Sequence, residues 1–346
     1  ILSLFSRKKE IKKFSEFEDY EEHILADSPL REFPAYICLE LTNACQLRCV
    51  MCQYQGTHAE GYQGCAGMLD EKIARKVLDE ADKYKCSIML NGDGESTLHP
   101  KFLDIFRYAS SKKNIPQLYF NTNANRLDEK LADQLTDFFE GAISVSLDGF
   151  KKSHEELRVG SNYDVVFNNL TNLQKLIDKK KARIKVQVNY VRYTQPEGEY
   201  EKFVKFWVER VDSVNSCVTW DHEYKLSHGR IKKYDPEKRQ ICNIPWQTFI
   251  VRWNGKVIPC TNCFTKAYEG FWIIGDVNKN SLKEIWNGDK YNKWREEVKN
   301  SKFNNICEPC DRWKMQQQYK DEYRDGMKIR HGGCFEVHEK MPLKDI

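Results

Sequence analysis

Strand-like and helix-like segments alternate from residue 36 to about residue 220, and this alternation limits the fold more than any other feature of the sequence. Apolar residues recur at helical spacing in residues 69–84 and 162–179. Six short apolar runs predict strands at residues 36–41, 87–91, 117–121, 142–147, 183–191 and 214–220. Such strand-then-helix units predict an α/β fold with a parallel sheet and right-handed crossovers. An open doubly wound sheet fits this periodicity as well as a barrel does. In either fold the site lies at the carboxyl ends of the strands.

Three cysteines stand directly after the first predicted strand, as Cys45, Cys49 and Cys52. Thiolates are soft ligands that select zinc or iron–sulfur clusters, and both usually take four of them. Because the local set stops at three, a cluster held here would have one iron open to a substrate or cofactor. The alternative is a structural zinc loop that borrows a distant fourth ligand.

The Cys-x3-Cys-x2-Cys spacing of Cys45, Cys49 and Cys52, on a loop after a first strand, resembles the radical S-adenosylmethionine (SAM) superfamily. This resemblance implies a partial (β/α)6 TIM-like barrel rather than a doubly wound sheet. It also implies a 4Fe–4S cluster whose open iron binds the amino and carboxylate groups of SAM.

The run Gly92-Asp93-Gly94-Glu95 follows the second predicted strand and is similar to the Gly-Gly-Glu-Pro segment that binds the SAM amino group in this superfamily. It departs from that pattern by Asp93 in place of the second glycine and Ser96 in place of proline. The resemblance also implies that Arg158 forks onto the SAM carboxylate, a task that suits a planar guanidinium. Further SAM contacts are expected at Met51, Asn123, Ser146, Asp148 and Val191.

A second group of cysteines follows a change of composition near residue 230. Asn254-Gly255 between apolar residues predicts a β-hairpin that brings Cys242 and Cys260 together. Residues 281–284 read as a capping box for a helix that leads the chain to Cys307 and Cys310. Four thiols therefore converge, and a four-cysteine zinc ribbon is the alternative to a cluster.

This second region resembles the SPASM/Twitch extension of radical SAM enzymes. The full SPASM pattern has further closely spaced cysteines after its Cys-x2-Cys, and here only Cys334 follows. The resemblance therefore implies one auxiliary 4Fe–4S cluster, held by Cys242, Cys260, Cys307 and Cys310. Whether Cys263 or Cys334 takes part stays open.

These features predict four regions: an N-terminal lead-in at residues 1–34, a radical SAM core at 35–230, an α+β SPASM/Twitch domain at 231–320 and a C-terminal tail at 321–346. With 55 basic and 51 acidic residues, the near-neutral balance argues against a nucleic-acid-binding surface. No apolar run has the roughly 18 residues of a membrane span. The composition and the expected oxygen-sensitive clusters indicate a reducing cytoplasm and a flavodoxin- or ferredoxin-type electron donor.

The resemblance implies reductive cleavage of SAM to a 5′-deoxyadenosyl radical that takes hydrogen from a C–H bond. The outcome is dehydrogenation, with the auxiliary cluster as electron acceptor, or epimerisation, for which Cys65 and Cys217 are the candidate hydrogen donors. We expect a small sugar-like or aminocyclitol substrate, because residues 1–34 are too short for a leader-binding domain. A peptide or protein maturase is the second candidate. A non-catalytic metal scaffold is a third, and it would have no need of SAM contacts.

Overall fold

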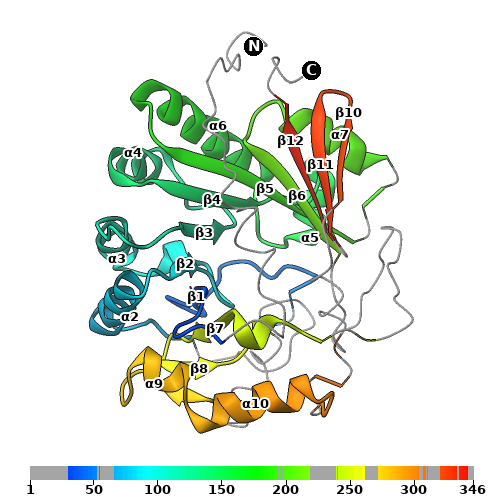
Figure 1. Ribbon diagram of the computed structural model, residues 1–346. Coiled ribbons are helices and arrows are strands. Elements are labelled where there is room, and N and C mark those ends of the chain that lie inside the picture. The colour runs from blue at the N-terminus through cyan, green and yellow to red at the C-terminus, as the bar shows by residue number, and fades with distance from the viewer. Residues whose placement is uncertain are drawn as a thin grey trace.

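The computed structural model describes residues 30–52, 54, 66–193, 195–196, 198–218, 239, 241–261, 272–303, 307–308, 310, 320–332 and 335–341. These residues form a sheet of twelve strands in the order β10-β11-β12-β6-β5-β4-β3-β2-β1-β7-β8-β9 (Figure 1). The middle of this order, from β6 to β1, is the parallel sheet that the sequence predicts.

Six parallel strands and the helices between them make up the core of the fold. Each predicted strand is confirmed, with ends that shift by two residues at most. The strands are β1 (Tyr36–Leu39), β2 (Ser87–Leu90), β3 (Leu118–Thr122), β4 (Gly141–Ser146), β5 (Ile184–Arg192) and β6 (Ser213–Val218). The helices are α2 (Glu71–Lys83), α3 (Phe102–Ser110), α4 (Glu129–Phe138), α5 (Lys151–Leu157), α6 (Tyr163–Lys180) and α7 (Glu199–Trp207). A short 3-10 helix, η2 (Ser96–Leu98), follows β2.

Local chemistry sets where several of these helices begin. The Asp70 carboxylate accepts a hydrogen bond from the Lys72 amide at 2.7 Å and caps α2. Asn162 caps α6 through the Val165 amide at 3.1 Å. Such caps satisfy amides that have no partner inside the helix, so they fix the first turn.

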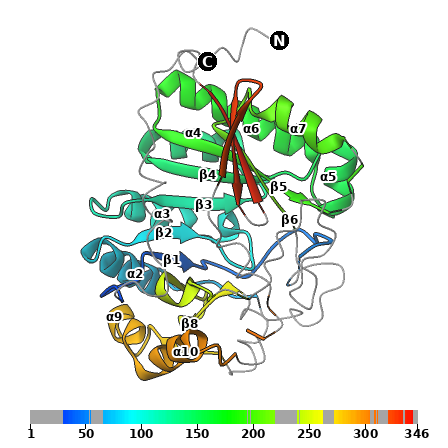
Figure 2. The ribbon, with the colours of Figure 1, turned by 45° about the vertical axis from the view of Figure 1, so that its right-hand side comes forward.

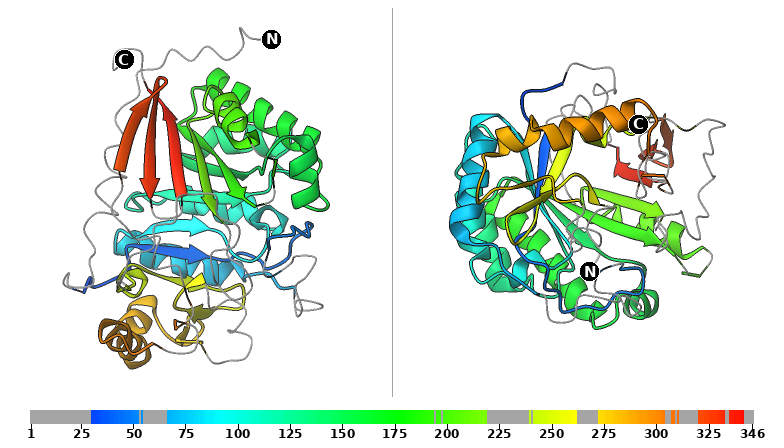
Figure 3. Two further views of the ribbon diagram at one scale, coloured as in Figure 1. Left: turned by 90° about the vertical axis from the view of Figure 1, so that its right-hand side faces the viewer. Right: turned by 90° about the horizontal axis from the view of Figure 1, so that it is seen from below.

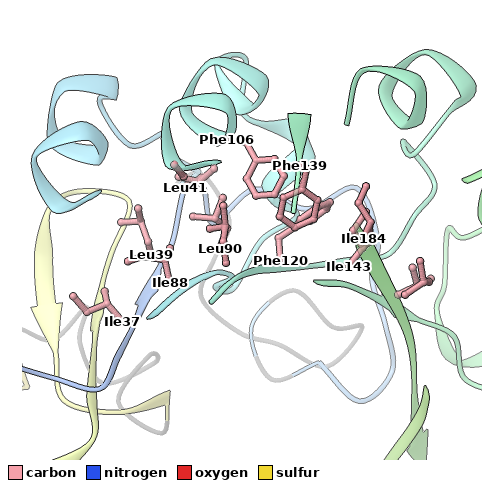
Figure 4. Close-up of a cluster of buried hydrophobic side chains, with 14 of the residues drawn as sticks. Ile37, Leu39, Leu41, Ile88, Leu90, Phe106, Phe120, Phe139, Ile143 and Ile184 are labelled. Carbon is pink, nitrogen blue, oxygen red and sulfur yellow. The ribbon is translucent and has the colours of Figure 1, made fainter. Parts of the chain in front are cut away.

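The hydrophobic core lies between the sheet and its helices. Alternate strand residues point to this side, as the cluster of Ile37, Leu39, Ile88 and Leu90 shows (Figure 4). The ring centroids of Phe106 and Phe120 are 5.1 Å apart, and those of Phe106 and Phe139 are 4.5 Å apart. The helices therefore cover one face of the sheet, and the other face is left to the site.

The region with the second group of cysteines extends the β1 edge of the sheet. Strand β7 (Thr248–Val251) pairs parallel with β1, and β8 (Lys256–Ile258) and β9 (Gly275–Asp276) follow antiparallel. The predicted Asn254-Gly255 hairpin is confirmed between β7 and β8, with Gly255 at a φ of 77°. A 3-10 helix, η3 (Ile244–Trp246), precedes β7. Two α-helices, α9 (Leu282–Trp286) and α10 (Asp289–Lys299), follow β9.

The predicted capping box is also confirmed at the start of α9. The Ser281 hydroxyl accepts from the Glu284 amide, and the Glu284 carboxylate accepts from the Ser281 amide at 2.8 Å.

Much of the region that the sequence analysis assigned to a C-terminal tail is built into the opposite edge of the sheet. Strands β10 (Lys320–Arg324), β11 (Met327–Gly332) and β12 (Phe335–Lys340) form an antiparallel unit, and β12 pairs with β6 (Figures 2 and 3). Glu336 on β12 forms an ion pair with Arg192 of β5 and accepts a hydrogen bond from the Tyr200 hydroxyl at 3.1 Å. Their charged sequence hides these strands, and the strand that attaches them to the sheet, β12, pairs with β6 residues more than a hundred positions away.

We expect Glu336→Ala to lower the free energy of unfolding by about 3 kcal/mol. The substitution removes the carboxylate that pairs with Arg192, and the Arg192 side chain is too buried for water to replace that partner. Burial alone would raise the pKa of Glu336, but His338 and Arg192 lower that pKa to about 2. The matched control is Glu209→Ala, which removes the half-exposed ion pair between Glu209 and Lys340 of the same strand. Urea unfolding of both variants tests this, and equal losses would contradict it.

Within the described part of the chain, no helix is both long and apolar enough to cross a bilayer.

Candidate functional site

The loop with Cys45, Cys49 and Cys52 leaves the carboxyl end of β1 and is fastened to the end of α5. The Arg48 amide donates to the carbonyl of Val159 at 2.8 Å, and the Val50 amide donates to that of Leu157 at 2.8 Å. The Cys52 amide donates to the Cys49 carbonyl at 3.0 Å, which forms a tight turn between these two cysteines. Backbone-to-backbone hydrogen bonds thus hold the loop in place.

The three thiols lie close enough to influence one another. Burial raises the pKa of Cys45 to about 12, and the negative charges of Glu95, Cys49 and Cys52 add to this shift. Burial also raises the pKa of Cys49, while the Arg158 guanidinium opposes the rise. A buried group of thiols needs positive charge before it can ionise, and iron supplies it. The donor set therefore fits an iron–sulfur cluster.

Positions 92 and 94 require glycine because other parts of the chain pack too closely for a side chain there. A Cβ atom at Gly92 would lie 2.4 Å from the Glu40 Cγ atom. A Cβ atom at Gly94 would lie 2.4 Å from the carbonyl oxygen of Ala44. Since Ala44 directly precedes Cys45, the missing side chains bring residues 92–95 against the base of the cysteine loop.

Glu95 is the centre of a buried hydrogen-bond network between β2 and β3. Its Oε1 atom accepts from the hydroxyls of Thr97 at 2.7 Å and Thr122 at 2.8 Å. Its Oε2 atom accepts from the Asn123 amide at 2.7 Å. Burial raises the pKa of Glu95, whereas these donors oppose the rise. A carboxylate has about four acceptor positions, so Oε2 keeps capacity for one further donor.

Asn123 connects this network to the cysteine loop. Its side-chain oxygen accepts from the Gln46 amide group at 2.9 Å, and its side-chain nitrogen lies 4.0 Å from the Cys45 sulfur. Asn123 and Glu95 therefore lie together at the ends of β3 and β2, beside the thiols, as the sequence analysis expects. Their contact with SAM stays a prediction.

Asp148 and Arg158 form a buried ion pair, with 2.7 Å between Asp148 Oδ2 and Arg158 Nε. The Asp148 Oδ1 atom accepts from the Val191 amide at 2.6 Å. The Nη1 atom of Arg158 lies 3.9 Å from the Cys49 sulfur. One edge of the guanidinium is thus held by Asp148, and another part of it faces a cluster ligand.

His154 contacts the backbone of this ion pair at Asp148. Its Nδ1 atom accepts from the Asp148 amide at 3.3 Å, and its Nε2 atom lies 2.9 Å from the Ser161 hydroxyl oxygen. Burial and the positive charge of Arg158 together lower the pKa of His154 to about 3. His154 is therefore neutral at physiological pH, and with Nδ1 as acceptor its ring proton sits on Nε2.

The remaining predicted positions lie on the same side of the sheet or outside the described residues. Ser146 ends β4 in register with Asn189 of β5, and Val191 pairs with Cys217 of β6. Met51 is half-buried in the cysteine loop. Cys65, Cys263 and Cys334 lie outside the described residues.

The second group of cysteines also gathers in space. Burial raises the pKa of Cys307 to about 12, and the nearby thiols of Cys260 and Cys310 contribute to the shift. Cys242, Cys260 and Cys307 are half-buried against the hydrophobic core. Three of the four predicted ligands are thus shown to lie near one another, and the donor set fits an auxiliary cluster.

A hydrogen bond links the two cysteine regions. The Tyr54 hydroxyl, two residues after Cys52, donates to the carbonyl of Thr261, one residue after Cys260, at 3.0 Å. Tyr54 and Cys260 also pack on one small apolar cluster formed by Cys38, Ile250 and Ile258. The two groups of thiols are therefore neighbours across the β1–β7 edge.

Sequence analysis missed two buried charged residues at this edge, Glu40 and Arg252. The Arg252 Nε atom lies 2.6 Å from Glu40 Oε2, and its Nη2 atom lies 3.0 Å from Asp93 Oδ2. The one signal in the sequence was a charged residue at the end of each of two otherwise apolar strands, Glu40 after residues 36–39 and Arg252 after residues 248–251.

Two family models match the chain. The model of the radical SAM superfamily matches residues 39–206, and the SPASM model of an iron–sulfur cluster-binding domain matches residues 242–311. Together they cover the core with the first cysteine loop and the region with the second group of cysteines.

Known proteins agree with these matches. A tungsten-containing aldehyde ferredoxin oxidoreductase cofactor-modifying protein from Pyrococcus furiosus is 24% identical over 80% of this chain and 86% of its own length. Mycofactocin maturase MftC from Mycobacterium tuberculosis is 29% identical over 41% of this chain and 36% of its own length. The fold is similar to that of Streptococcus suis SuiB bound to precursor peptide SuiA, with a TM-score of 0.61, 14% identity, and coverage of 85% of this chain and 78% of that one.

The fold, the cysteine loop and both family models agree on the cofactors, which are SAM with a 4Fe–4S cluster in the core and auxiliary iron–sulfur ligation in the second domain. The partial barrel and the C-terminal cluster-binding domain that the sequence predicts are both present. The protein belongs to the radical SAM superfamily and carries a C-terminal SPASM domain.

Proposed function

We propose that this radical SAM enzyme removes hydrogen from a C–H bond of a small sugar-like or aminocyclitol substrate, giving dehydrogenation or epimerisation. The observation that carries this proposal is the polar character of the sheet face that the helices leave uncovered. On β4, β5 and β6, most of the residues that alternate with the core positions are hydrophilic, among them Ser144, Gln187, Asn189 and Asn215. A substrate with many hydroxyl or amino groups suits such a face.

These side chains already form a ladder of two hydrogen-bonded pairs across the strands. Asn189 donates to the Ser144 hydroxyl, and Asn215 donates to the Gln187 side-chain oxygen at 3.2 Å. Each amide keeps further donor and acceptor capacity, so the ladder can hydrogen-bond a polar ligand without losing its own order. An apolar peptide side chain would leave these amides unsatisfied, at a cost of about 1–3 kcal/mol for each buried group.

A relative that aligns over most of this chain supports a small-molecule substrate. The Pyrococcus protein is named as cofactor-modifying and matches 80% of the present chain. The alternative, a peptide or protein maturase, is supported by the mycofactocin maturase, which matches 41% of it. The first alignment covers about twice the share of this chain that the second does, and for this reason we favour the small molecule.

When bound, the reduced cluster and SAM supply the hydrogen-abstracting radical, and the auxiliary cluster supplies an electron acceptor. Cys45, Cys49 and Cys52 would hold the first cluster. Glu95 has one acceptor position left for the SAM ammonium group, and Arg158 has the guanidinium nitrogens that Asp148 does not engage for the SAM carboxylate. The ladder of amides would orient the substrate. A flavodoxin- or ferredoxin-type protein would be the reductant.

Two outcomes depend on different residues of this chain. Net oxidation would need the auxiliary ligands Cys242, Cys260, Cys307 and Cys310. Epimerisation would need a hydrogen donor, and Cys217 is the described candidate. Cys217 pairs with Val191 of β5, so it follows the amide ladder toward the carboxyl end of β6. Cys65 is the other candidate donor.

The test is an anaerobic assay of the reconstituted full chain. We would count iron and sulfide, add dithionite and SAM, and screen sugars, aminocyclitols and peptides for stimulated formation of 5′-deoxyadenosine. About 8 irons per chain and stimulation by a polyhydroxylated compound are expected. Stimulation by peptides alone would overturn the substrate proposal in favour of a maturase.

A further inference from the structure

We propose that Arg252, at the end of a SPASM-domain strand, is a positioning residue for SAM. It acts by holding Asp93, and with it residues 92–95, in the conformation that receives the SAM ammonium group. The inference goes beyond the proposed reaction and rests on the assignment of residues 92–95 to SAM. No part of the predicted site included Arg252.

Arg252 is buried, with 3% of the residue exposed, and it bridges two acidic side chains from the core. Its Nε atom lies 2.6 Å from Glu40 Oε2, and its Nη2 atom lies 3.0 Å from Asp93 Oδ2. The side chains of both carboxylates are wholly buried. The planar fork of a guanidinium can engage two carboxylates at once, and an ammonium group cannot do so with the same geometry.

The backbone completes the connection. Glu40 Oε1 accepts from the Asp93 amide at 3.0 Å, and Glu40 Oε2 accepts from the Trp253 amide at 3.1 Å. Glu40 also packs where a side chain at Gly92 would lie. The position of Asp93 is therefore fixed twice, by the carboxylate of Glu40 through its amide and by Arg252 through its side chain.

Arg252 is itself fixed by the SPASM hairpin. Its amide donates to the Lys256 carbonyl at 2.8 Å, and its carbonyl accepts from the Gly255 amide at 2.8 Å. The residue before it, Val251, pairs with Leu39 of β1. The hairpin that leads to Cys260 thus carries the residue that holds Asp93, and the geometry of the auxiliary domain reaches the SAM segment through this contact.

The charges of this group explain why the contact matters. Two carboxylates share one guanidinium, so the group carries one surplus negative charge, which suits a segment that receives a cation. Without Arg252, the two buried carboxylates would lose the positive charge that they share. Their mutual repulsion would then move residues 92–95.

The experiment compares Arg252→Gln and Arg252→Lys with a matched control, Arg295→Gln. Arg295 is also buried in the SPASM domain, where it donates to the carbonyls of Pro245 at 2.9 Å and Trp286 at 2.8 Å. Each full-length variant is reconstituted anaerobically. Iron content, the dissociation constant of SAM by equilibrium dialysis, and the change in the electron paramagnetic resonance signal of the reduced cluster on SAM addition are then measured.

We expect Arg252→Gln to keep its iron and to bind SAM roughly 10- to 100-fold more weakly, as is typical when an outer-shell partner of a binding group is lost. Arg252→Lys should recover part of this loss, and Arg295→Gln should bind SAM as the unmodified protein does. Equal weakening in Arg252→Gln and Arg295→Gln would mean general damage to the domain and would overturn the proposal.

A double-mutant cycle with Asp93→Asn identifies the route. If Arg252 acts through Asp93, the double variant binds SAM no more weakly than the worse single variant. Additive losses would overturn the route through Asp93. A loss in Asp93→Asn with none in Arg252→Gln would overturn the role of Arg252 and leave the segment assignment standing. Unchanged SAM affinity in both would overturn the assignment and the proposal together.

Discussion

Replacing Cys49 with alanine is expected to abolish SAM cleavage while the auxiliary cluster stays loaded. The loop supplies three thiols in eight residues, and a variant with two of them cannot hold a four-iron cluster with one open iron. The iron content should fall from about 8 to about 4 per chain. Iron analysis and anaerobic detection of 5′-deoxyadenosine after dithionite and SAM are the measurements.

Cys86→Ala is the matched control for this variant. Cys86 is also a buried thiol, and it packs in the hydrophobic core under α2. Its loss should lower stability slightly and leave the iron content and SAM cleavage unchanged. If Cys49→Ala still made 5′-deoxyadenosine, the assignment of this loop would be wrong.

Replacing Cys310 with alanine is expected to remove the auxiliary cluster and to block net oxidation of the substrate. Cys310 lies in the turn with Cys307, where its amide donates to the Cys307 carbonyl at 3.2 Å, and its thiol adds to the rise in the pKa of Cys307. Iron should fall to about 4 per chain while SAM cleavage continues at the first cluster. The variant would then form 5′-deoxyadenosine without forming oxidised substrate. Chromatography of both compounds would reveal this.

Glu308→Gln serves as the control because Glu308 occupies the same turn and its side chain is exposed. Its iron content and product should match those of the unmodified protein. An unchanged iron count in Cys310→Ala would contradict the auxiliary role. Loss of one cluster together with continued conversion of substrate would favour epimerisation, with Cys217 the next residue to replace.

Local sequence patterns determined much of this protein. The six strands of the core, the hairpin at Gly255 and the capping box at Ser281 all appear where the sequence predicts them. Each depends on residues a few positions apart, through side-chain periodicity, turn conformation or helix capping. The three-thiol loop is local in the same way, because its spacing alone limits what it can bind.

Other features appeared only in the folded chain. Strands β10 to β12 carry charged residues instead of an apolar run, so the sequence did not predict them, and β12 depends on β6 for its pairing. Likewise, the glycines of residues 92–95 are explained by contacts with Glu40 and Ala44, and not by a ligand alone.

The buried ion pairs were the hardest feature to predict from the sequence. Arg252 and Glu40 are 212 positions apart, and Arg192 and Glu336 are 144 apart. A buried charge is stable only beside its partner, and no periodicity records which distant residue that partner is. Sequence alone therefore determined the strands of the core, the cofactors and the radical SAM class of enzyme. The tertiary structure decided how the SPASM domain meets residues 92–95, because only folding brings Arg252 into contact with Glu40 and Asp93.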